Sequence, residues 1–340
     1  MSARAVAVLV VLLLALGGGA LYLQRQEATE RPPNAAALGQ PVLKDLKAAD
    51  IAAIRIVEPK ATLTLQRKDD GWAIAERDGF PADPAKVREF ALKAIELKVG
   101  QSEPIGEQDR GRLKLDASGT AVDFLAAGDK PLAKLVVGKK YFSREPEYPD
   151  RAPADGRFVQ RPDSPGTVFI VKDPLAQASA RSADWIRRAG PKIEKVKTLE
   201  VRPQEGAGYR IERSGDNADW KLADAKAGEK LEVTRANAAS YVLGQIELAD
   251  VAPKEDRDNP SAMGLDKATL IDATTLAGAR YEIKVGKLSG DNYYVALSTT
   301  SSDPQDQLLA RHILLVPKSK LEDTLKPRAE MLAKKEDTKK

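Results

Sequence analysis

Apolar and polar residues alternate along three short segments at the start of the main polar part of the chain. Alternation with a period of two places every second side chain on one face of a strand, so this pattern predicts β-strands. Lys68-Asp-Asp-Gly71 lies between the last two segments and is a tight-turn signal. The three segments therefore predict an antiparallel meander. Their apolar positions are Ile51, Ile54 and Ile56, then Leu63 and Leu65, then Trp72 and Ile74.

After residue 83 the spacing of the apolar positions becomes that of a helix. Asp83 is a suitable N-cap, and Pro84 is favoured at the first helical position. The sequence therefore predicts a helix that continues to about Lys98 with one apolar face. That face consists of Val87, Phe90, Ala91, Ala94 and Ile95.

Later segments alternate again and predict further strands. Residues 122–125 and 132–137 predict a hairpin across Gly128-Asp129, and residues 269–271 and 281–285 predict another across Gly278. Single strands are expected at residues 157–161, 168–171, 292–297 and 313–316.

Elements of the first half of the chain recur in the second half. Trp72 is matched by Trp220, a separation of 220 − 72 = 148 positions. Val137-Gly-Lys139 is matched by Val285-Gly-Lys287, and 285 − 137 = 148 again. A module that recurs at a constant separation indicates a duplicated folding unit. The sequence thus predicts an α+β fold with two tandem repeated modules, each a curved antiparallel sheet with one main helix.

Further helices are expected beyond the first one. In the second module, Thr234 is the predicted cap of the main helix. Its predicted apolar face carries Ala238, Tyr241, Val242, Gln245 and Ile246. Asp173-Pro174 is expected to start a helix that carries Trp185 and Ile186. Residues 318–333 are expected to form its counterpart, bent or broken near Pro327.

The N-terminus differs from the rest of the chain. Residues 5–23 carry no charge and would extend about 28 Å as a helix, which is close to the hydrocarbon thickness of a bilayer. A cleavable signal peptide has a shorter apolar core, so we interpret the segment as an uncleaved anchor and keep cleavage as the alternative. An N-terminal apolar segment normally exports the polar body behind it. We therefore expect a single-pass protein of the cytoplasmic (inner) membrane with its C-terminal body in the periplasm.

This organisation divides the chain into five parts. Residues 1–23 are the transmembrane anchor, in contact with membrane lipid through residues 5–23. Residues 24–43 are a juxtamembrane linker that contains Arg31-Pro-Pro-Asn34. The α+β modules are expected at residues 44–190 and 191–333. Residues 334–340 are charged and expected to be a disordered tail.

Composition limits the possible chemistry. The chain has 340 residues, with 54 basic and 50 acidic residues and a formal charge of +4, which is too weak to indicate nucleic-acid binding. It contains no cysteine, so disulfides, cysteine-ligated metals and thiol nucleophiles are excluded. No cofactor is expected.

Several residues are candidates for catalytic or binding groups. His312 is the single histidine, and we interpret it as a surface residue at the start of an edge strand. Asp116 and Asp266 occupy matching positions, but each is explained as a turn or cap residue. The glycines of Gly138-Lys139 and Gly286-Lys287 are expected to supply a positive φ, with both lysines solvated. Trp72 and Trp220 are expected to be core anchors.

The long loop expected at residues 140–166 is harder to explain by structure alone. Long irregular loops in compact domains are often functional, and exposed aromatic and arginine side chains favour protein binding. The corresponding stretch of the second module, residues 298–310, is expected to be a shorter polar loop. The candidate partner-binding residues are Tyr141, Phe142, Arg144, Tyr148 and Arg151.

Four elements of the sequence carry a resemblance to a known family. They are the apolar start, Gly71-Trp-Ala-Ile74, Phe80-Pro-Ala-Asp83, and Leu135-Val-Val-Gly138 before the long loop. In these elements the chain resembles the bacterial membrane-anchored family of domain of unknown function 4340 (DUF4340). Residues 44–176 match its pattern best, and residues 192–317 resemble a diverged second copy. The resemblance implies an exported envelope protein. Members of the family occur beside auxiliary components of ABC-type transport systems linked to gliding motility.

Three functional hypotheses follow. The first is a non-enzymatic envelope protein that acts as a scaffold or partner-binding body for a membrane or envelope protein, accessory to an ABC-type transport system. The second is an exported hydrolase that acts on envelope polymers through carboxylates. The third is a glycan- or solute-binding module. The sequence indicates no catalytic, cofactor-binding or metal-ligating residue.

Overall fold

The computed structural model describes residues 37–68 and 71–333. The fold is α+β, with two antiparallel sheets and a few helices that are mostly short. One compact unit comprises the residues up to Ala61 together with Arg88–Ser179, and the other comprises Thr62–Val87 together with Ala180–Lys340. The predicted anchor, the predicted tail and most of the predicted linker lie outside the described residues. No helix within residues 37–68 and 71–333 is long and apolar enough to cross a membrane.

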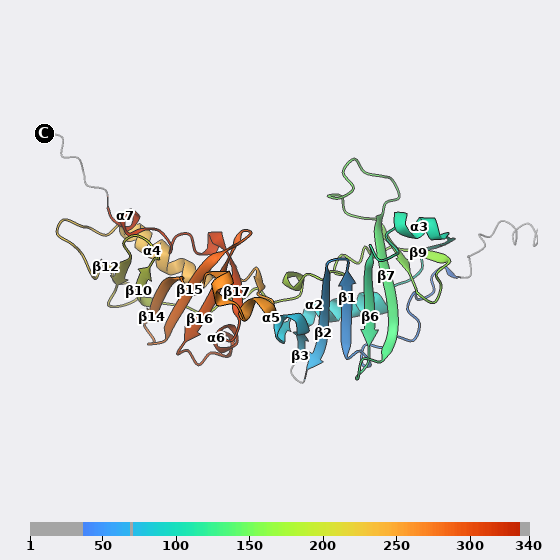
Figure 1. Ribbon diagram of the computed structural model, residues 1–340, viewed down its shortest axis with the longest axis horizontal. Coiled ribbons are helices and arrows are strands. Elements are labelled where there is room, and N and C mark those ends of the chain that lie inside the picture. The colour runs from blue at the N-terminus through green and yellow to red at the C-terminus, as the bar shows by residue number, and fades with distance from the viewer. Residues whose placement is uncertain (1–36, 69–70, 334–340) are drawn as a thin grey trace, which may run out of the picture. The chain divides into compact units, whose positions relative to one another are not determined.

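The first sheet has nine strands in the order β4-β3-β2-β1-β6-β7-β8-β9-β5 (Figure 1). The predicted meander and the predicted hairpin across Gly128-Asp129 both form, although the turn residues Asp69 and Asp70 lie outside the described residues. Ile54 and Ile56 on β1 are fully buried, as their alternation predicts. The strands are β1 (Ala53–Glu58), β2 (Ala61–Lys68), β3 (Gly71–Ile74), β4 (Phe80–Ala82), β5 (Gln101–Pro104), β6 (Thr120–Leu125), β7 (Pro131–Tyr141), β8 (Gly156–Gln160) and β9 (Thr167–Val171).

The predicted main helix is α2 (Pro84–Ile95), which runs across one face of this sheet behind β1 and β6 in Figure 1. Asp83 caps it, because its side-chain Oδ1 accepts a hydrogen bond from the amide of Ala85 at 3.0 Å. The predicted apolar face is confirmed, with Val87, Phe90, Ala91 and Ala94 buried and Ile95 half-buried. The ring of Phe90 stacks on that of Phe124 from β6, with centroids 6.3 Å apart.

The second sheet has eight strands in the order β12-β11-β10-β14-β15-β16-β17-β13. The two sheets have the same strand order when β10 is taken as the equivalent of β1 and β14 as the equivalent of β6. The one difference is that the second sheet has no equivalent of β4. The predicted hairpin across Gly278 and the strands predicted at residues 292–297 and 313–316 are confirmed. The strands are β10 (Val196–Arg202), β11 (Tyr209–Glu212), β12 (Lys221–Leu222), β13 (Asp250–Val251), β14 (Thr269–Thr275), β15 (Arg280–Ser289), β16 (Asn292–Thr299) and β17 (Ile313–Pro317).

The remaining helical elements are short. The α-helices are α3 (Glu107–Arg112), α4 (Val233–Tyr241), α5 (Lys254–Arg257), α6 (Pro304–Leu309) and α7 (Arg328–Met331). The 3₁₀ turns are η2 (Ala75–Arg77), η3 (Ser182–Asp184), η4 (Val242–Gln245), η5 (Pro260–Met263) and η6 (Lys318–Lys320).

The predicted cap of the second main helix is wrong, and its predicted apolar face is wrong in part. Ile246 is buried as predicted, whereas Ala238 and Val242 are half-buried and Gln245 is exposed. Glu232 caps α4, because its side chain accepts a hydrogen bond from the amide of Thr234. The predicted core residue Tyr241 is 69% exposed. Both the predicted set and the observed set follow helical spacing, so the spacing alone did not distinguish the two faces. The buried residues of this face are Ala236, Ala239, Ser240 and Leu243.

The helix predicted to carry Trp185 and Ile186 does not form. Residues 172–190, all of them described, contain only the 3₁₀ turn η3. Leu175 has a φ of 48°, which a continuing α-helix does not allow. The carbonyl of Trp185 instead accepts a hydrogen bond from the amide of Asp83, and Ile186 forms a β-bridge with Ala82. The two side chains are buried, but pairing with the edge of β4 replaces the hydrogen bonds of the predicted helix.

The predicted helix over residues 318–333 is wrong in length, although the predicted break near Pro327 is present. The segment forms η6 and, after Pro327, the single turn α7. Its last residues pair with another segment: the amide of Glu232 donates to the carbonyl of Met331, and that of Ala333 donates to the carbonyl of Lys230. These bonds use backbone groups that a longer helix would have satisfied internally.

Candidate functional site

An open cavity of about 900 Å³ lies on the first compact unit beside the second half of β7 and the start of β8. Its walls come from the β1–β2 turn, the end of α3, the segment before β6, and the residues that follow β7. The strand pairs β6–β7 and β7–β8 bring most of these segments together. The amide of Lys139 donates to the carbonyl of Leu113 at 2.9 Å, which fastens the segment after α3 to β7.

Basic residues predominate in the charged part of this lining. They outnumber the acidic lining residues Glu58, Glu145 and Asp150. The site therefore has a positive charge surplus, and we call it the cationic cavity. Its basic residues are Lys60, Arg112, Lys114, Lys139, Lys140 and Arg157.

Arg157 is the most unusual of these residues. It is half-buried on β8, and its Nε is buried without a hydrogen-bond partner. Within residues 37–68 and 71–333, its guanidinium makes no hydrogen bond, ion pair or ring contact. Removal from water lowers the pKa of Arg157 below its ordinary value, although the group stays charged. An unpaired, partly desolvated cation is unfavourable for folding, so another reason for its presence is required.

Lys140 lies directly opposite Arg157 on β7 and has a different environment. Its ammonium group donates to the carbonyls of Pro149, Asp150 and Ala152 at 3.3, 2.9 and 3.1 Å. These acceptors lie in the loop of residues 142–155, which joins β7 to β8. The lysine therefore fixes the returning part of the loop to the strand from which the loop leaves.

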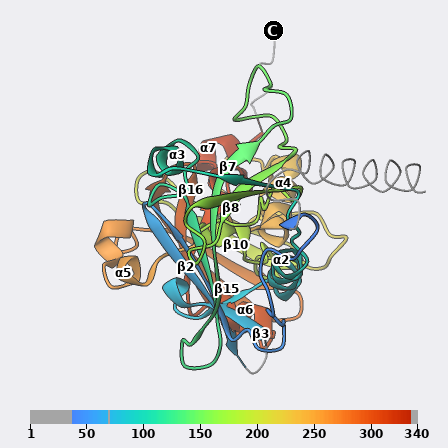
Figure 2. The same cartoon turned by 90° about the vertical axis from the view of Figure 1, so that its right-hand side faces the viewer.

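Further contacts close the base of the loop. The amide and hydroxyl of Ser143 donate to Oδ2 of Asp155 at 2.9 and 2.5 Å, and the amide of Asp155 donates to the carbonyl of Tyr141. The hydrogen bonds from Ser143 hold the pKa of the Asp155 carboxyl below its usual range. Tyr141 meets Phe158 edge to face, with ring centroids 5.5 Å apart. Figure 2 shows that the loop between β7 and β8 extends away from the sheet.

The predicted partner-binding residues divide between two surfaces. Tyr141 belongs to β7 and is half-buried, and Phe142 lines the cationic cavity. Arg144, Tyr148 and Arg151 are exposed on the loop, and Tyr148 is 63% exposed. The sequence did not identify the basic residues of the cavity. Gly138-Lys139 was the only available signal, since the other cations lie on segments that the fold brings together.

The loop is shorter than predicted, because β8 occupies residues 156–160 within the expected range of 140–166. Its match in the second unit was also assigned wrongly. By sheet order β7 and β8 correspond to β15 and β16, which are joined at Gly290 and Asp291. Residues 298–310 instead comprise the end of β16 and most of its connection to β17, including α6. The alternation of apolar and polar residues predicts strands but not which strands are neighbours. It therefore could not show which connection of the second unit corresponds to the β7–β8 loop.

Gly138 and Gly286 are required for a reason other than the predicted positive φ. Neither is among the described residues with positive φ, and both lie within strands at a shift in register. A Cβ on Gly138 would lie 2.4 Å from the carbonyl oxygen of Leu113, and a Cβ on Gly286 would lie 2.3 Å from that of Met263. Glycine is needed here because a neighbouring backbone passes too closely for any side chain.

Positive φ occurs at a neighbouring pair of matching positions. Lys114 has a φ of 55°, and its counterpart Gly264 has a φ of 68°. Lysine is disfavoured in this left-handed region, whereas glycine adopts it readily. The cationic cavity thus contains a lysine where the second unit has the residue that suits the backbone.

The other sequence candidates are structural. Asp116 accepts hydrogen bonds from the amide and hydroxyl of Ser118, which lower the pKa of its carboxyl and confirm the turn interpretation. His312 directly precedes β17 and is half-buried rather than at the surface, and β17 is not the predicted edge strand because it lies between β16 and β13. Its Nδ1 lies 3.0 Å from the carbonyl oxygen of Leu308, and its ring meets Phe80 edge-on. No cluster of acidic or histidine residues in the described part of the chain could hold a metal ion.

The matched tryptophans differ in burial. Trp220 is 3% exposed, as expected for a core anchor, and the guanidinium of Arg213 lies 4.8 Å from its ring centroid. Trp72 is only half-buried, with Arg67 at 5.3 Å. The core-anchor prediction therefore holds fully for Trp220 alone.

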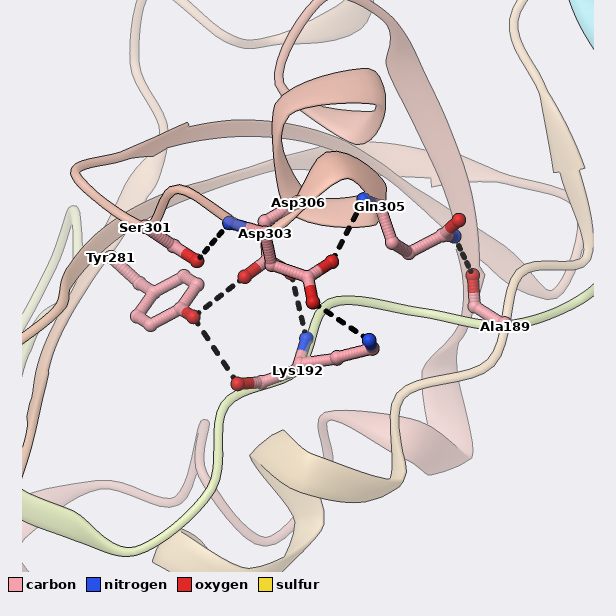
Figure 3. A network of polar contacts seen from close by, with 7 residues as sticks. All are labelled: Ala189, Lys192, Tyr281, Ser301, Asp303, Gln305 and Asp306. Atoms are coloured by element: carbon pink, nitrogen blue, oxygen red, sulfur yellow. Dashed lines mark hydrogen bonds and ion pairs between the residues drawn. The ribbon is translucent and has the colours of Figure 1, made fainter. Parts of the chain in front are cut away.

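A polar network in the second unit surrounds Asp306 (Figure 3). Its Oδ1 accepts from the amide of Lys192 at 2.8 Å, and its Oδ2 accepts from the hydroxyl of Tyr281 at 2.7 Å. The ammonium of Lys192 pairs with Asp303 at 2.7 Å. Burial, with a contribution from Asp306, raises the pKa of Tyr281 to about 12. Asp306 is fully buried and both its carboxylate oxygens accept hydrogen bonds, so the network holds the chain near Lys192 against β15 and α6.

A family model described as Domain of unknown function (DUF4340) matches residues 72–268, which is more than half of the chain. The chain belongs to this family. The matched region of this DUF4340 protein includes the basic residues of the cationic cavity except Lys60. No match was found among curated proteins or among solved structures.

Proposed function

We propose that this DUF4340 protein is a non-enzymatic envelope protein, anchored in the cytoplasmic membrane by residues 5–23, whose first unit binds a protein partner. The observation that carries this proposal is the loop of residues 142–155, which is fastened at its base and presents Arg144, Tyr148 and Arg151 to solvent. In this proposal the body lies in the periplasm and serves as an accessory to an ABC-type transport system, in keeping with the family resemblance.

The fastening of the loop supports binding. A partner that meets a free loop must order it, and this ordering reduces the affinity. Here Lys140 and Ser143 already hold the loop through hydrogen bonds to its returning part. Tyrosine and arginine are the residue types that contribute most often to binding energy at protein interfaces. The exposed side chain of Tyr148 is therefore a candidate for a residue that contributes strongly to partner binding.

The comparison of the two sheets also supports a function for this loop. Both sheets have the same strand order apart from β4, which favours two copies of one module. In the proposed duplication, a turn at Gly290 and Asp291 takes the place of residues 142–155. The sheet forms in the second copy with a short turn at this place, so the long connection of the first copy is not needed for the sheet. This favours a role for the loop in binding over a role in folding.

The cavity favours one alternative, a module that binds a glycan or solute. Pockets of roughly 300–1,000 Å³ with a few polar groups are typical of small-molecule sites, and about 900 Å³ lies within that range. In that case the loop would be a wall of the pocket, and Tyr148 would not contact a protein.

A photo-crosslinking experiment tests the choice. A photoreactive phenylalanine analogue is placed at Tyr148, or as a matched control at Tyr241, an exposed tyrosine of the second unit. We expect irradiation of cells to give one defined protein adduct from position 148 and none from position 241. Absence of an adduct at 148, or the same adduct from both positions, would contradict the proposal. Mass spectrometry of the adduct tests whether the partner is a transport component.

Membrane orientation has a separate test. Alkaline phosphatase fused to the C-terminus becomes an active enzyme only outside the cytoplasm. We expect activity in intact cells and recovery of the fusion in the membrane fraction. An inactive fusion, with activity from a cytoplasmic reporter at the same place, would refute the periplasmic placement.

A further inference from the structure

We propose that the cationic cavity binds an acidic peptide segment, with a carboxylate of that segment paired to the guanidinium of Arg157. This inference rests on the proposed function, because it identifies the chemistry of the partner segment that the first unit takes. It adds a site separate from the exposed loop residues Arg144, Tyr148 and Arg151.

The unpaired state of Arg157 is the first argument. A buried or half-buried cation is normally paired, and a cation without a partner opposes folding. Arg328 in the second unit shows the ordinary arrangement, with Asp224 and Glu229 each at 2.7 Å. Arg157 has no such partner among the residues that the structure describes. A carboxylate offers two oxygens to the planar guanidinium, so a carboxylate ligand supplies what the fold omits.

The surrounding lysines are the second argument. The ammonium of Lys140 is bonded to the loop carbonyls, and Lys140 lies opposite Arg157. Lys140 therefore does not compete with Arg157 for a ligand in the cavity. Lys60, Lys114 and Lys139 also line the cavity and form no ion pair within residues 37–68 and 71–333. A concave surface with unpaired charges of one sign attracts the opposite sign and accelerates association.

The remaining lining distinguishes a peptide from other anions. A cavity of about 900 Å³ is far larger than a phosphate ion, and Phe142, Pro149 and Phe158 add apolar walls. Glu58, Glu145 and Asp150 in the same lining oppose a dense polyanion such as nucleic acid or polyphosphate. An acidic peptide carries its carboxylates on side chains with apolar methylene groups, so it can pair with the cations and also contact the apolar walls.

The test uses the full chain in detergent and a fluorescent hexaglutamate peptide, with hexaglutamine as the neutral match. Binding is followed by fluorescence anisotropy against ionic strength. We expect hexaglutamate to bind at least about tenfold more tightly than hexaglutamine, and Arg157→Gln to weaken hexaglutamate binding at least about tenfold. Arg157→Lys should give an intermediate affinity, because it keeps the charge but loses the planar pair of donors.

The control variant is Arg55→Gln. Arg55 lies on β1, pairs with Asp129 at 3.7 Å and does not line the cavity, so its removal should change affinity by less than about twofold. Unchanged hexaglutamate binding in Arg157→Gln would overturn the inference. So would displacement of the peptide by millimolar inorganic phosphate at constant ionic strength, because that result assigns a small-anion site. Arg157→Gln breaks no described hydrogen bond, and its melting curve checks that it remains folded.

Failure of this inference is distinguishable from failure of the proposed function. If the adduct at Tyr148 forms but Arg157→Gln leaves hexaglutamate binding unchanged, the inference of an acidic-peptide site is wrong and the partner-binding proposal stands. If hexaglutamate binds through Arg157 but no adduct forms at Tyr148, the cavity is an anion site and the loop-mediated partner proposal is wrong.

Discussion

Lys140 and Arg157 lie directly opposite each other on β7 and β8. Opposed residues on neighbouring strands share a face of the sheet, and two like charges there are unfavourable. The structure separates their roles, because Lys140 binds three loop carbonyls while Arg157 has no partner among the described residues. One pair of positions thus fixes the loop and supplies an unpaired cation to the cavity.

Replacement of Lys140 should loosen the loop without unfolding the unit. Lys140→Met removes the donors to Pro149, Asp150 and Ala152, and we expect amide exchange at residues 148–152 to accelerate roughly tenfold or more. Hydrogen-exchange mass spectrometry measures the effect. Lys139→Met is the matched control, since its ammonium makes no bond in the described residues. Equal exchange in both variants would show that the lysine does not hold the loop.

Replacement of Arg157 should stabilise the protein. Arg157→Met removes an unpaired, half-buried charge, and we expect the free energy of unfolding in urea to rise by on the order of 1 kcal/mol. Arg328→Met is the contrasting variant, because it leaves Asp224 and Glu229 without their cation and should lower stability. A fall in stability in Arg157→Met would mean that the guanidinium contributes to the fold.

Alanine at either strand glycine should destabilise its unit. A Cβ at residue 138 or 286 would lie 2.4 or 2.3 Å from a backbone carbonyl, and relief requires the two segments to move apart. We expect each of Gly138→Ala and Gly286→Ala to lower the free energy of unfolding by about 2–3 kcal/mol. Gly166→Ala is the control, because a Cβ there meets nothing within 4 Å and its φ is not positive. Equal melting temperatures for Gly138→Ala and Gly166→Ala would contradict the close approach.

Glu229 should make stability depend on acid pH. Its hydrogen bond with Arg328 is the main cause that lowers the pKa of its carboxyl to about 2. The contribution of a depressed carboxyl pKa is fully present above the unfolded value near 4.5 and is lost as pH falls towards 2. Urea unfolding of wild type and Glu229→Gln should therefore differ at pH 7 and converge between about pH 4.5 and 2. A difference that is constant with pH would contradict the assignment.

Much of the fold was predictable where local pattern and tertiary structure agree. The alternation through Ile54 and Ile56 and the helical spacing from Val87 to Ala94 each allow one buried face, and both faces are confirmed. Sequence reasoning failed where two faces had equal claims, as in α4, where Ala236 and Ala239 are buried and Tyr241 is exposed. It also failed at Trp185, which was expected on a helix but whose backbone carbonyl accepts a hydrogen bond from the amide of Asp83, next to β4.

The candidate site was predictable only in part. The loop was recognisable from its length and its aromatic and basic residues. The cavity was not, because Lys60, Lys114 and Arg157 belong to three segments that are separate in sequence and meet through strand pairing. The absence of a partner for Arg157 is likewise a property of the fold.

Lys114 gives the cavity a marker that can be sought in related sequences. Its backbone is left-handed, as is that of Gly264 at the matching position of the second unit. Left-handed backbone is about 1–2 kcal/mol less favourable for a residue with a side chain, so drift under selection for stability alone would favour glycine at residue 114. A family member that keeps lysine or arginine there should retain the anion site. A member with glycine there, and without the counterpart of Arg157, should have lost the site while keeping the sheet.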